Sequence, residues 1–255
     1  MARSSIQMKS LVLTGLFLYL GTGLYLYLVQ RDYIYFPVHS IASVYEQRIF
    51  ENEGQQIKAT VLNKGHAKAI IYFGGNAENV DYNSERFSDL FNDHTLYLIK
   101  YRGYAGSTGE PTEEGLYSDA LHIYDEIKDN HDQVSVLGRS LGSAVATYLA
   151  SKREIHKLVL ITPFDSILSM AQSQYPIFPV SILLKDHYDS LSRVSSISSE
   201  TLIIAAAEDR IIQMHHTERL VEGFSKGVLF EIIQGVGHNN ISRNPRYFGL
   251  IREFI

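Results

Sequence analysis

Three side chains have the types and the order along the chain that acyl transfer by a serine nucleophile requires, namely Ser140, Asp209 and His238. A serine hydroxyl is a weak nucleophile at neutral pH, so it needs a base to take its proton and a carboxylate to orient that base. Imidazole suits the role of base because it titrates close to neutral pH. The three residues are far apart along the chain, so the fold must bring them together.

Ser140 lies in the pattern G-x-S-x-G, as GRSLG at residues 138–142, after an apolar run at 134–137 and before a run of small helix formers. A strand that turns into a helix within one residue strains that residue, and its neighbours two positions away must be small. This context predicts a nucleophile elbow, with the Ser140 hydroxyl at a helix N-terminus whose dipole favours negative charge. A looser copy, AGSTG at residues 105–109, precedes a Glu-Pro pair and lacks this context.

The base must follow the serine along the chain and lie on a loop at the end of a strand. Of the ten histidines, His238 fits this requirement best. It lies in GVGHNN after the last predicted strand, and the flanking glycines let the imidazole reach across the sheet edge. His215 and His216 also follow the serine, but they lie in a predicted helix and are expected at the surface.

The acid is assigned to Asp209, which closely follows the apolar run TLIIAAA. Glu208 is the adjacent alternative. Asp165 also follows a predicted strand, but it precedes the predicted cap and would leave the Asp209 loop without a role. Each residue alone could be an ordinary hydrogen-bonded loop residue. Three such residues at strand ends, in the order Ser, Asp, His, favour a catalytic triad.

The tetrahedral intermediate of acyl transfer also needs hydrogen-bond donors for its oxyanion. One is expected from the backbone N–H of Leu141, immediately after the nucleophile, and another from Gly75 or Asn76 in the loop after the strand at residues 68–73. Glycine in that loop also allows the backbone to come close to a substrate. The chain contains no cysteine, and its sequence indicates no metal or organic cofactor.

Short apolar runs alternate with helical patterns along most of the chain, which is typical of strands buried on both faces of a parallel sheet. A hairpin pattern within residues 43–63 predicts antiparallel edge strands. The sequence therefore predicts an α/β fold with a mostly parallel sheet of about eight strands and helices on both faces. The other predicted strands include residues 68–73, 95–101, 157–162, 201–207 and 228–233.

Residues 11–29 contain no charge and are long enough to cross ~30 Å of hydrocarbon as a helix. A cleaved signal peptide would have a shorter apolar core and a small-residue cleavage site, and a buried core helix is a weaker explanation for so long an uncharged stretch. We expect a membrane anchor at residues 1–35, followed by a catalytic domain at 36–255. Arg3 and Lys9 precede the span, so the catalytic domain is expected on the extracytoplasmic side.

Residues 164–198 interrupt the alternation of strands and helices with Tyr-Pro and Phe-Pro pairs and scattered apolar residues. They predict a short cap over the sheet edge whose apolar side chains line a substrate pocket, although a plain surface excursion fits the pattern equally well. The net charge of −5 and the lack of basic runs argue against nucleic-acid binding. No obligate protein partner is indicated.

These motifs resemble those of the α/β-hydrolase superfamily, and in particular those of its small membrane-anchored hydrolase-domain proteins in bacteria and eukaryotes. The resemblance implies that Ser140 is the nucleophile, Asp209 the acid and His238 the base, with Leu141 and Asn76 binding the oxyanion. It spans nearly the whole chain, in RDYIYFP after the apolar helix, YFGGNAEN, YRGYAGSTGEPTEEGLYSDA, GRSLGSAVA, PFDSI, AEDRII and GHNN.

Two positions depart from the family pattern. Gly74 stands where a histidine is usual, which leaves open which residue of that loop donates, and Gln213 stands where a proline is common. Family members include esterases and thioesterases that remove acyl chains from proteins. The resemblance therefore implies a membrane-anchored serine hydrolase acting on esters or thioesters of acyl or lipid-like substrates. An aminopeptidase-type hydrolase of the same fold and a catalytically silent, membrane-tethered binding protein are the alternatives.

Overall fold

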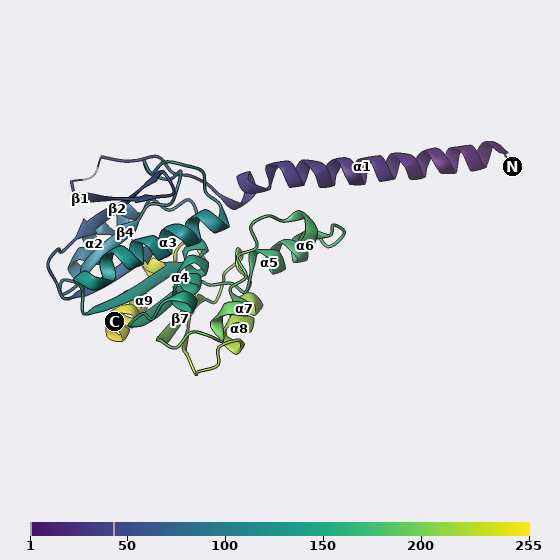
Figure 1. Ribbon diagram of the computed structural model, residues 1–255. Helices are drawn as coiled ribbons and strands as arrows, with labels where there is room; N and C mark the ends of the chain where they lie inside the picture. The colour runs from purple at the N-terminus through teal and green to yellow at the C-terminus, as the bar shows by residue number, and fades with distance from the viewer. Residues whose placement is uncertain (1, 43) are drawn as a thin grey trace.

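The fold is built around a central sheet (Figure 1). The computed structural model describes residues 2–42 and 44–255, with side chains from residue 7 onward. The strands of the sheet are β1 (Glu46–Asn52), β2 (Gln55–Leu62), β3 (Lys68–Phe73), β4 (Thr95–Ile99), β5 (Gln133–Arg139), β6 (Lys157–Ile161), β7 (Glu200–Ala206) and β8 (Leu229–Ile233). They form one eight-stranded sheet in the order β1-β2-β4-β3-β5-β6-β7-β8. The β1–β2 and β2–β4 pairs are antiparallel and the others parallel, which confirms the predicted sheet.

The inner strands are buried on both faces, because helices cover the sheet from either side. Every residue of β4 is buried, and in β3 and β6 only the leading lysine is not. Strands of this kind carry apolar side chains on both faces, as KAIIYF and KLVLI do. The carboxyl ends of β5, β6, β7 and β8 consequently meet along one edge, which is where loops that bear function gather in open α/β sheets.

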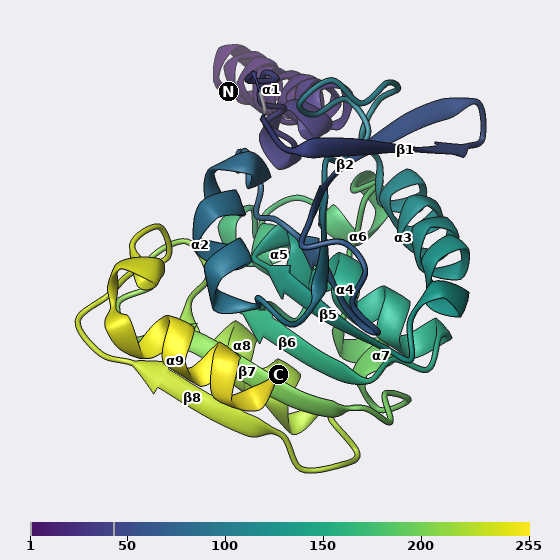
Figure 2. The same cartoon turned by 90° about the vertical axis from the view of Figure 1, so that its left-hand side faces the viewer.

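The helices divide between the two faces (Figure 2). On one face α3 (Glu113–Ile127), α4 (Leu141–Lys152) and α8 (Met214–Glu222) pack on the larger apolar core. On the other face α2 (Ser84–Leu90) and α9 (Pro245–Phe254) pack on the smaller core. Short 3₁₀ helices lie at Val80–Asn83, Lys128–Asn130 and Ile241–Arg243.

Helix α1 (Ala2–Ile34) projects away from the sheet as a long rod (Figure 1). Its segment Gln7–Ile34 has 28 residues and contains an 18-residue stretch with a mean hydropathy of 1.7, so it is long and apolar enough to cross a membrane. Apolar side chains such as Leu11, Leu18 and Leu24 lie exposed along it. The helix extends beyond the predicted span at both ends.

The insertion between β6 and β7 carries α5 (Ile167–Gln174), α6 (Val180–Leu183) and α7 (Leu191–Val194). Its two ends meet, because the N–H of Leu191 donates to the carbonyl of Asp165 at 2.9 Å. The buried Asp165 carboxylate contacts His216 Nδ1 at 2.8 Å and Arg219 at 2.9 Å. The expectation that His216 lies at the surface is therefore wrong, since its face of α8 packs inward and Asp165 gives its ring a partner.

Candidate active site

Ser140 is the single residue between the end of β5 and the start of α4. Its backbone has φ 51° and ψ −118°, a conformation that residues other than glycine rarely adopt. Its N–H donates to the carbonyl of Ile161 in the neighbouring strand at 2.9 Å. The sharp turn lifts the side chain off the sheet and holds it at the N-terminus of α4, as the elbow pattern predicts.

The glycines on either side of Ser140 are required because the backbones of strand and helix are in contact there. A Cβ added to Gly138 would lie 2.3 Å from the carbonyl oxygen of Gly142. One added to Gly142 would lie 2.1 Å from the carbonyl oxygen of Phe73 in β3. Both clashes involve backbone atoms that cannot swing away, so the G-x-S-x-G spacing is a packing requirement of this turn.

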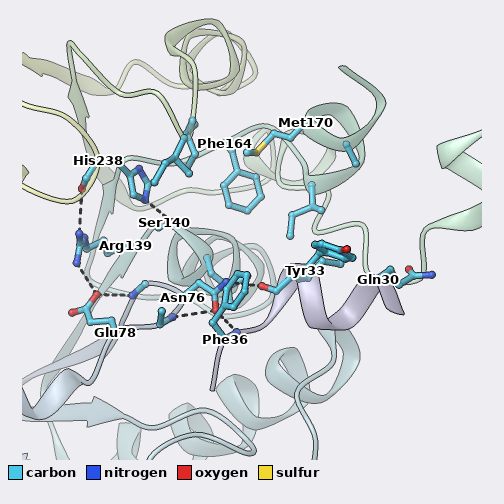
Figure 3. Close-up of a pocket in the computed structure, with 18 of the residues that line it drawn as sticks. Gln30, Tyr33, Phe36, Asn76, Glu78, Arg139, Ser140, Phe164, Met170 and His238 are labelled. Carbon is cyan, nitrogen blue, oxygen red and sulfur yellow. Dashed lines mark hydrogen bonds and ion pairs between the residues drawn. The ribbon is translucent and has the colours of Figure 1, made fainter. Parts of the chain in front are cut away.

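His238 and Asp209 lie on loops that follow β8 and β7, and Figure 3 shows the His238 ring beside Ser140. His238 Nε2 lies 2.9 Å from Ser140 Oγ, and His238 Nδ1 lies 2.7 Å from Asp209 Oδ2. The imidazole and the carboxylate are both nearly buried, with 7% and 4% of their side-chain surface exposed. With Nδ1–H donating to the carboxylate, Nε2 is left to accept the serine proton.

Asp209 is itself held in place by its own loop. The second carboxylate oxygen, Oδ1, accepts hydrogen bonds from the N–H groups of Ile211 at 2.9 Å and Ile212 at 2.8 Å. A carboxylate with all its positions engaged cannot rotate away from the imidazole, so the ring is oriented through it.

The alternative residues are not brought to Ser140. Asp165 and His216 pair with each other beneath the cap, and His215 is exposed on α8. Glu208 is exposed, and it meets the His238 loop through its backbone, whose N–H donates to Val236 at 2.9 Å.

The loop after β3 lies against the elbow. A Cβ added to Gly75 would lie 3.6 Å from Ser140 Cβ, which fits the expected close approach of this loop. However, the N–H of Gly75 donates to Glu78 Oε2 at 2.7 Å. The sequence offered Gly75 and Asn76 as alternative donors, and the Gly75 N–H is already engaged. Asn76 and Leu141 also line the pocket, and Leu141 lies in the first turn of α4, where backbone N–H groups have no partner within the helix.

An ion pair between Arg139 and Glu78, which the sequence did not predict, supports both sides of the site. Arg139 Nη1 lies 2.9 Å from Glu78 Oε2, and Arg139 Nη2 donates to the carbonyl of His238 at 3.2 Å. Burial alone would lower the pKa of Arg139, but Glu78 together with Tyr72 and Tyr247 raises that pKa. The pair thus connects the Gly75 loop to the His238 loop. In the sequence, the only signal for this role is the position of Arg139 inside GRSLG.

A pocket of about 1100 Å³ opens beside Ser140. In Figure 3, Ser140 and His238 lie at one end, Phe164 and Met170 along one side, and Tyr33 and Gln30 of α1 at the other end. Cap residues line it as the sequence predicts, whereas the contribution of α1 was not foreseen. Within the described residues, no cluster of three or more His, Cys, Asp or Glu side chains could hold a metal ion.

Comparison with known proteins agrees with this architecture. Residues 68–181 match a family model described as the alpha/beta hydrolase fold. The chain is 31% identical over 251 residues to the uncharacterized protein Rv2307c of Mycobacterium tuberculosis, covering 92% of this chain and 87% of that one. It is 25% identical over 194 residues to human alpha/beta hydrolase domain-containing protein 17B, covering 73% of this chain and 65% of that one.

Solved structures of similar fold include the esterase Pf2001 of Pyrococcus furiosus, with a TM-score of 0.67, 16% identity and coverage of 86% of this chain and 97% of that one. A predicted CIB-like hydrolase from Thermoplasma acidophilum gives a TM-score of 0.61 at 16% identity, over 84% and 98% of the two chains. At such identities the likeness concerns the fold. The chain belongs to the α/β-hydrolase superfamily, and together the matches support its assignment as a hydrolase.

Proposed function

We propose that this protein is a membrane-anchored serine hydrolase that cleaves ester or thioester bonds of acyl or lipid-like substrates. The observation that carries the proposal is the continuous contact from Ser140 Oγ through His238 to Asp209, at 2.9 Å and 2.7 Å. A hydroxyl, an imidazole and a carboxylate joined in this order are the parts that nucleophilic acyl transfer needs.

In the first half of the reaction Ser140 Oγ attacks the acyl carbonyl carbon while its proton passes to His238 Nε2. The N–H groups of Leu141 and Asn76 donate to the oxyanion of the tetrahedral intermediate. The intermediate then expels the alcohol or thiol, which takes the proton from His238 and leaves the acyl group on Ser140. In the second half His238 deprotonates a water that attacks this ester, releasing the carboxylic acid and the free serine.

The pocket and the N-terminal helix support an acyl or lipid-like substrate. The pocket is lined mainly by apolar side chains beyond the reacting groups, and its volume is at the upper end of ordinary ligand sites. Helix α1 supplies the anchor, and the cations at Arg3 and Lys9 favour a cytoplasmic N-terminus with the catalytic domain on the extracytoplasmic side.

The test uses the full chain in detergent or nanodiscs, with short and medium p-nitrophenyl esters and a fluorophosphonate. We expect ester turnover and labelling of the parent protein, and loss of both in Ser140→Ala, with turnover falling on the order of 10⁶-fold. Ser107→Ala, which alters the serine of the looser motif, serves as control and is expected to keep both.

Equal turnover of Ser140→Ala and the parent protein would disprove the nucleophile assignment. A folded protein that the fluorophosphonate does not label would instead favour a silent binding protein. Faster cleavage of aminoacyl-naphthylamides than of acyl esters would favour the aminopeptidase alternative.

A further inference from the structure

We infer that the tip of the cap, residues 175–184, is inserted in the same bilayer as α1, and that the pocket between them takes the acyl chain of a membrane lipid directly from that bilayer. The first part rests on the surface of the cap and on α1 crossing a membrane, which belongs to the proposed function. The second part rests on the proposed function, because it assigns the substrate of the Ser140 site.

The cap tip has the surface of a membrane-facing segment. Residues 166–184 contain no charged side chain, and at the tip Ile177 and Ile182 are 71% and 79% exposed. Exposed aliphatic side chains grouped on an uncharged loop are unusual on a surface that faces water. They are the expected composition of a loop that faces lipid.

The tip lies alongside α1 at a depth that a spanning helix would place in hydrocarbon. The ring of Phe178 stacks on Tyr19 with centroids 4.9 Å apart, and the Tyr19 hydroxyl donates to the carbonyl of Ile177 at 2.9 Å. Tyr19 precedes Arg31 by twelve residues, which is about 18 Å along a helix axis. If α1 spans the membrane, the tip must enter it too.

Most backbone N–H groups of the tip have acceptors within the protein, as an environment without water requires. Hydrocarbon offers no hydrogen-bond partners, so backbone groups there must be satisfied within the protein. The carbonyl of Ile177 accepts a hydrogen bond from the Tyr19 hydroxyl, and Pro176 and Pro179 have no N–H that needs an acceptor. The N–H groups of Tyr175, Phe178, Val180, Ile182, Leu183 and Leu184 all donate to carbonyls of the cap itself.

Both segments change from uncharged to charged at one level, which marks the membrane surface. Residues 10–30 of α1 carry no charge and span about 31 Å, close to the thickness of the hydrocarbon core. The next residue, Arg31, pairs with Asp186 at 2.9 Å. The Lys185 N–H donates to the Gln30 side chain at 2.6 Å, and its ammonium lies 4.3 Å from the Tyr27 ring centre.

The pocket connects this level to the reacting serine. Its lipid-side walls are Leu26 and Tyr27 of α1 and Phe178 and Leu183 of the cap, and Ser140 lies at its other end. An acyl chain that moves from the bilayer into this part of the pocket stays in apolar surroundings, so its transfer costs little free energy. The ester carbonyl would then reach Ser140 just beyond Arg31, where lipid ester groups lie.

Insertion is tested by fluorescence, because the chain contains no tryptophan. Full-length Ile182→Trp and Ile177→Trp proteins are placed in vesicles of phosphatidylcholine with or without bromine on the acyl chains. Leu229→Trp, which is 59% exposed on the edge strand β8, is the matched control. We expect brominated lipid to quench the tip tryptophans and to leave the control unchanged.

Quenching of the tip tryptophans no greater than that of Leu229→Trp would overturn the inserted tip, including the case in which a second copy of the chain covers it. This measurement does not use activity, so it stands even if Ser140 proves not to be a nucleophile.

The substrate route is tested in nanodiscs with Leu26→Trp, which narrows the wall that α1 contributes. We expect the ratio of kcat/KM for a long-chain lipid ester to that for a short soluble ester to fall about tenfold, equivalent to two methylene groups left unburied. Leu24→Trp, at a side chain that is 60% exposed on α1 and does not line the pocket, is expected to keep the ratio. An unchanged ratio in Leu26→Trp would overturn the route.

Discussion

The side-chain oxygen of Asn76 accepts a hydrogen bond from the backbone N–H of Phe36 at 2.9 Å. The amide nitrogen of Asn76 donates to the carbonyl of Ile34, the last residue of α1, at 2.6 Å. The same residue offers its backbone N–H to the proposed oxyanion. The end of α1 and the loop after β3 are therefore fastened together by one side chain, and the position of α1 helps to set the position of the proposed donor.

Asn76→Ala is expected to lower kcat by about 10²-fold, the usual effect of losing one oxyanion donor, because the loop is no longer fixed. KM should change little, since the pocket walls remain. Tyr104→Phe is the control, because it removes the hydroxyl that donates to Asn76 Oδ1 at 2.8 Å and accepts from the Phe36 N–H, but leaves the bonds of Asn76 with Ile34 and Phe36. A fall in thermal stability with unchanged kcat would show that Asn76 is only structural.

Glu78→Gln is expected to reduce the free energy of unfolding by about 3 kcal/mol, because it leaves the largely buried charge of Arg139 without its carboxylate counter-charge. Adding Arg139→Met should restore part of the loss, since no unpaired charge remains. Glu231→Gln, which breaks an exposed pair with Arg246, should cost less than about 1 kcal/mol. Denaturant unfolding followed by circular dichroism measures all three, and equal losses in the two single variants would contradict the assignment.

Gly142→Ala is expected to prevent folding, because the new methyl group would lie 2.1 Å from the Phe73 carbonyl oxygen and 2.6 Å from that of Gly74. Gly249→Ala is the matched control. No atom lies within 4 Å of the Cβ it adds, and alanine favours a helix over glycine, so it should fold normally. The yield of folded protein and the unfolding temperature distinguish the two, and a folded, active Gly142→Ala would show that the elbow can open.

The free energy of unfolding should decrease as the pH is lowered below about 6.5, because His94 takes up a proton more readily in the unfolded chain. Burial of its ring lowers its pKa below the ordinary 6.5, an effect that the contact with Asp93 only partly opposes. The unfolded chain therefore binds this proton at a higher pH than the folded chain, so stability is full above 6.5 and is lost as the pH falls. His94→Gln should flatten the pH dependence of the unfolding temperature, whereas exposed His215→Gln should not. An unaltered slope in His94→Gln would exclude this group.

The central sheet could be predicted from the sequence because its signals are local. Runs such as KAIIYF are apolar over the length of a strand, and the turn at Glu53-Gly54 joins β1 and β2 where the hairpin pattern places it. The spacing of Ser140 within its glycines likewise reports a contact between adjacent elements. These features need only short stretches of chain to be recognised.

The rest depends on how distant elements dock. The stacking of Tyr19 on Phe178 joins residues far apart in sequence, and nothing in either segment specifies the other. His216 is buried because α8 turns it toward Asp165, and the Gly75 N–H is occupied because Glu78 folds back onto it. Such contacts follow from three-dimensional placement and leave no periodic signal.

The hydrogen bond between Asp165 and Leu191 closes residues 166–190 of the cap into a loop, and the chain then continues through α7 to the start of β7. Lengthening such a loop adds little entropic cost, because the entropic cost of closing a loop grows only slowly with its length. Insertions of other sizes could therefore replace this one without moving β6, β7 or the candidate catalytic residues. In this architecture the choice of substrate can evolve as an exchangeable module, while the chemistry stays with the strands.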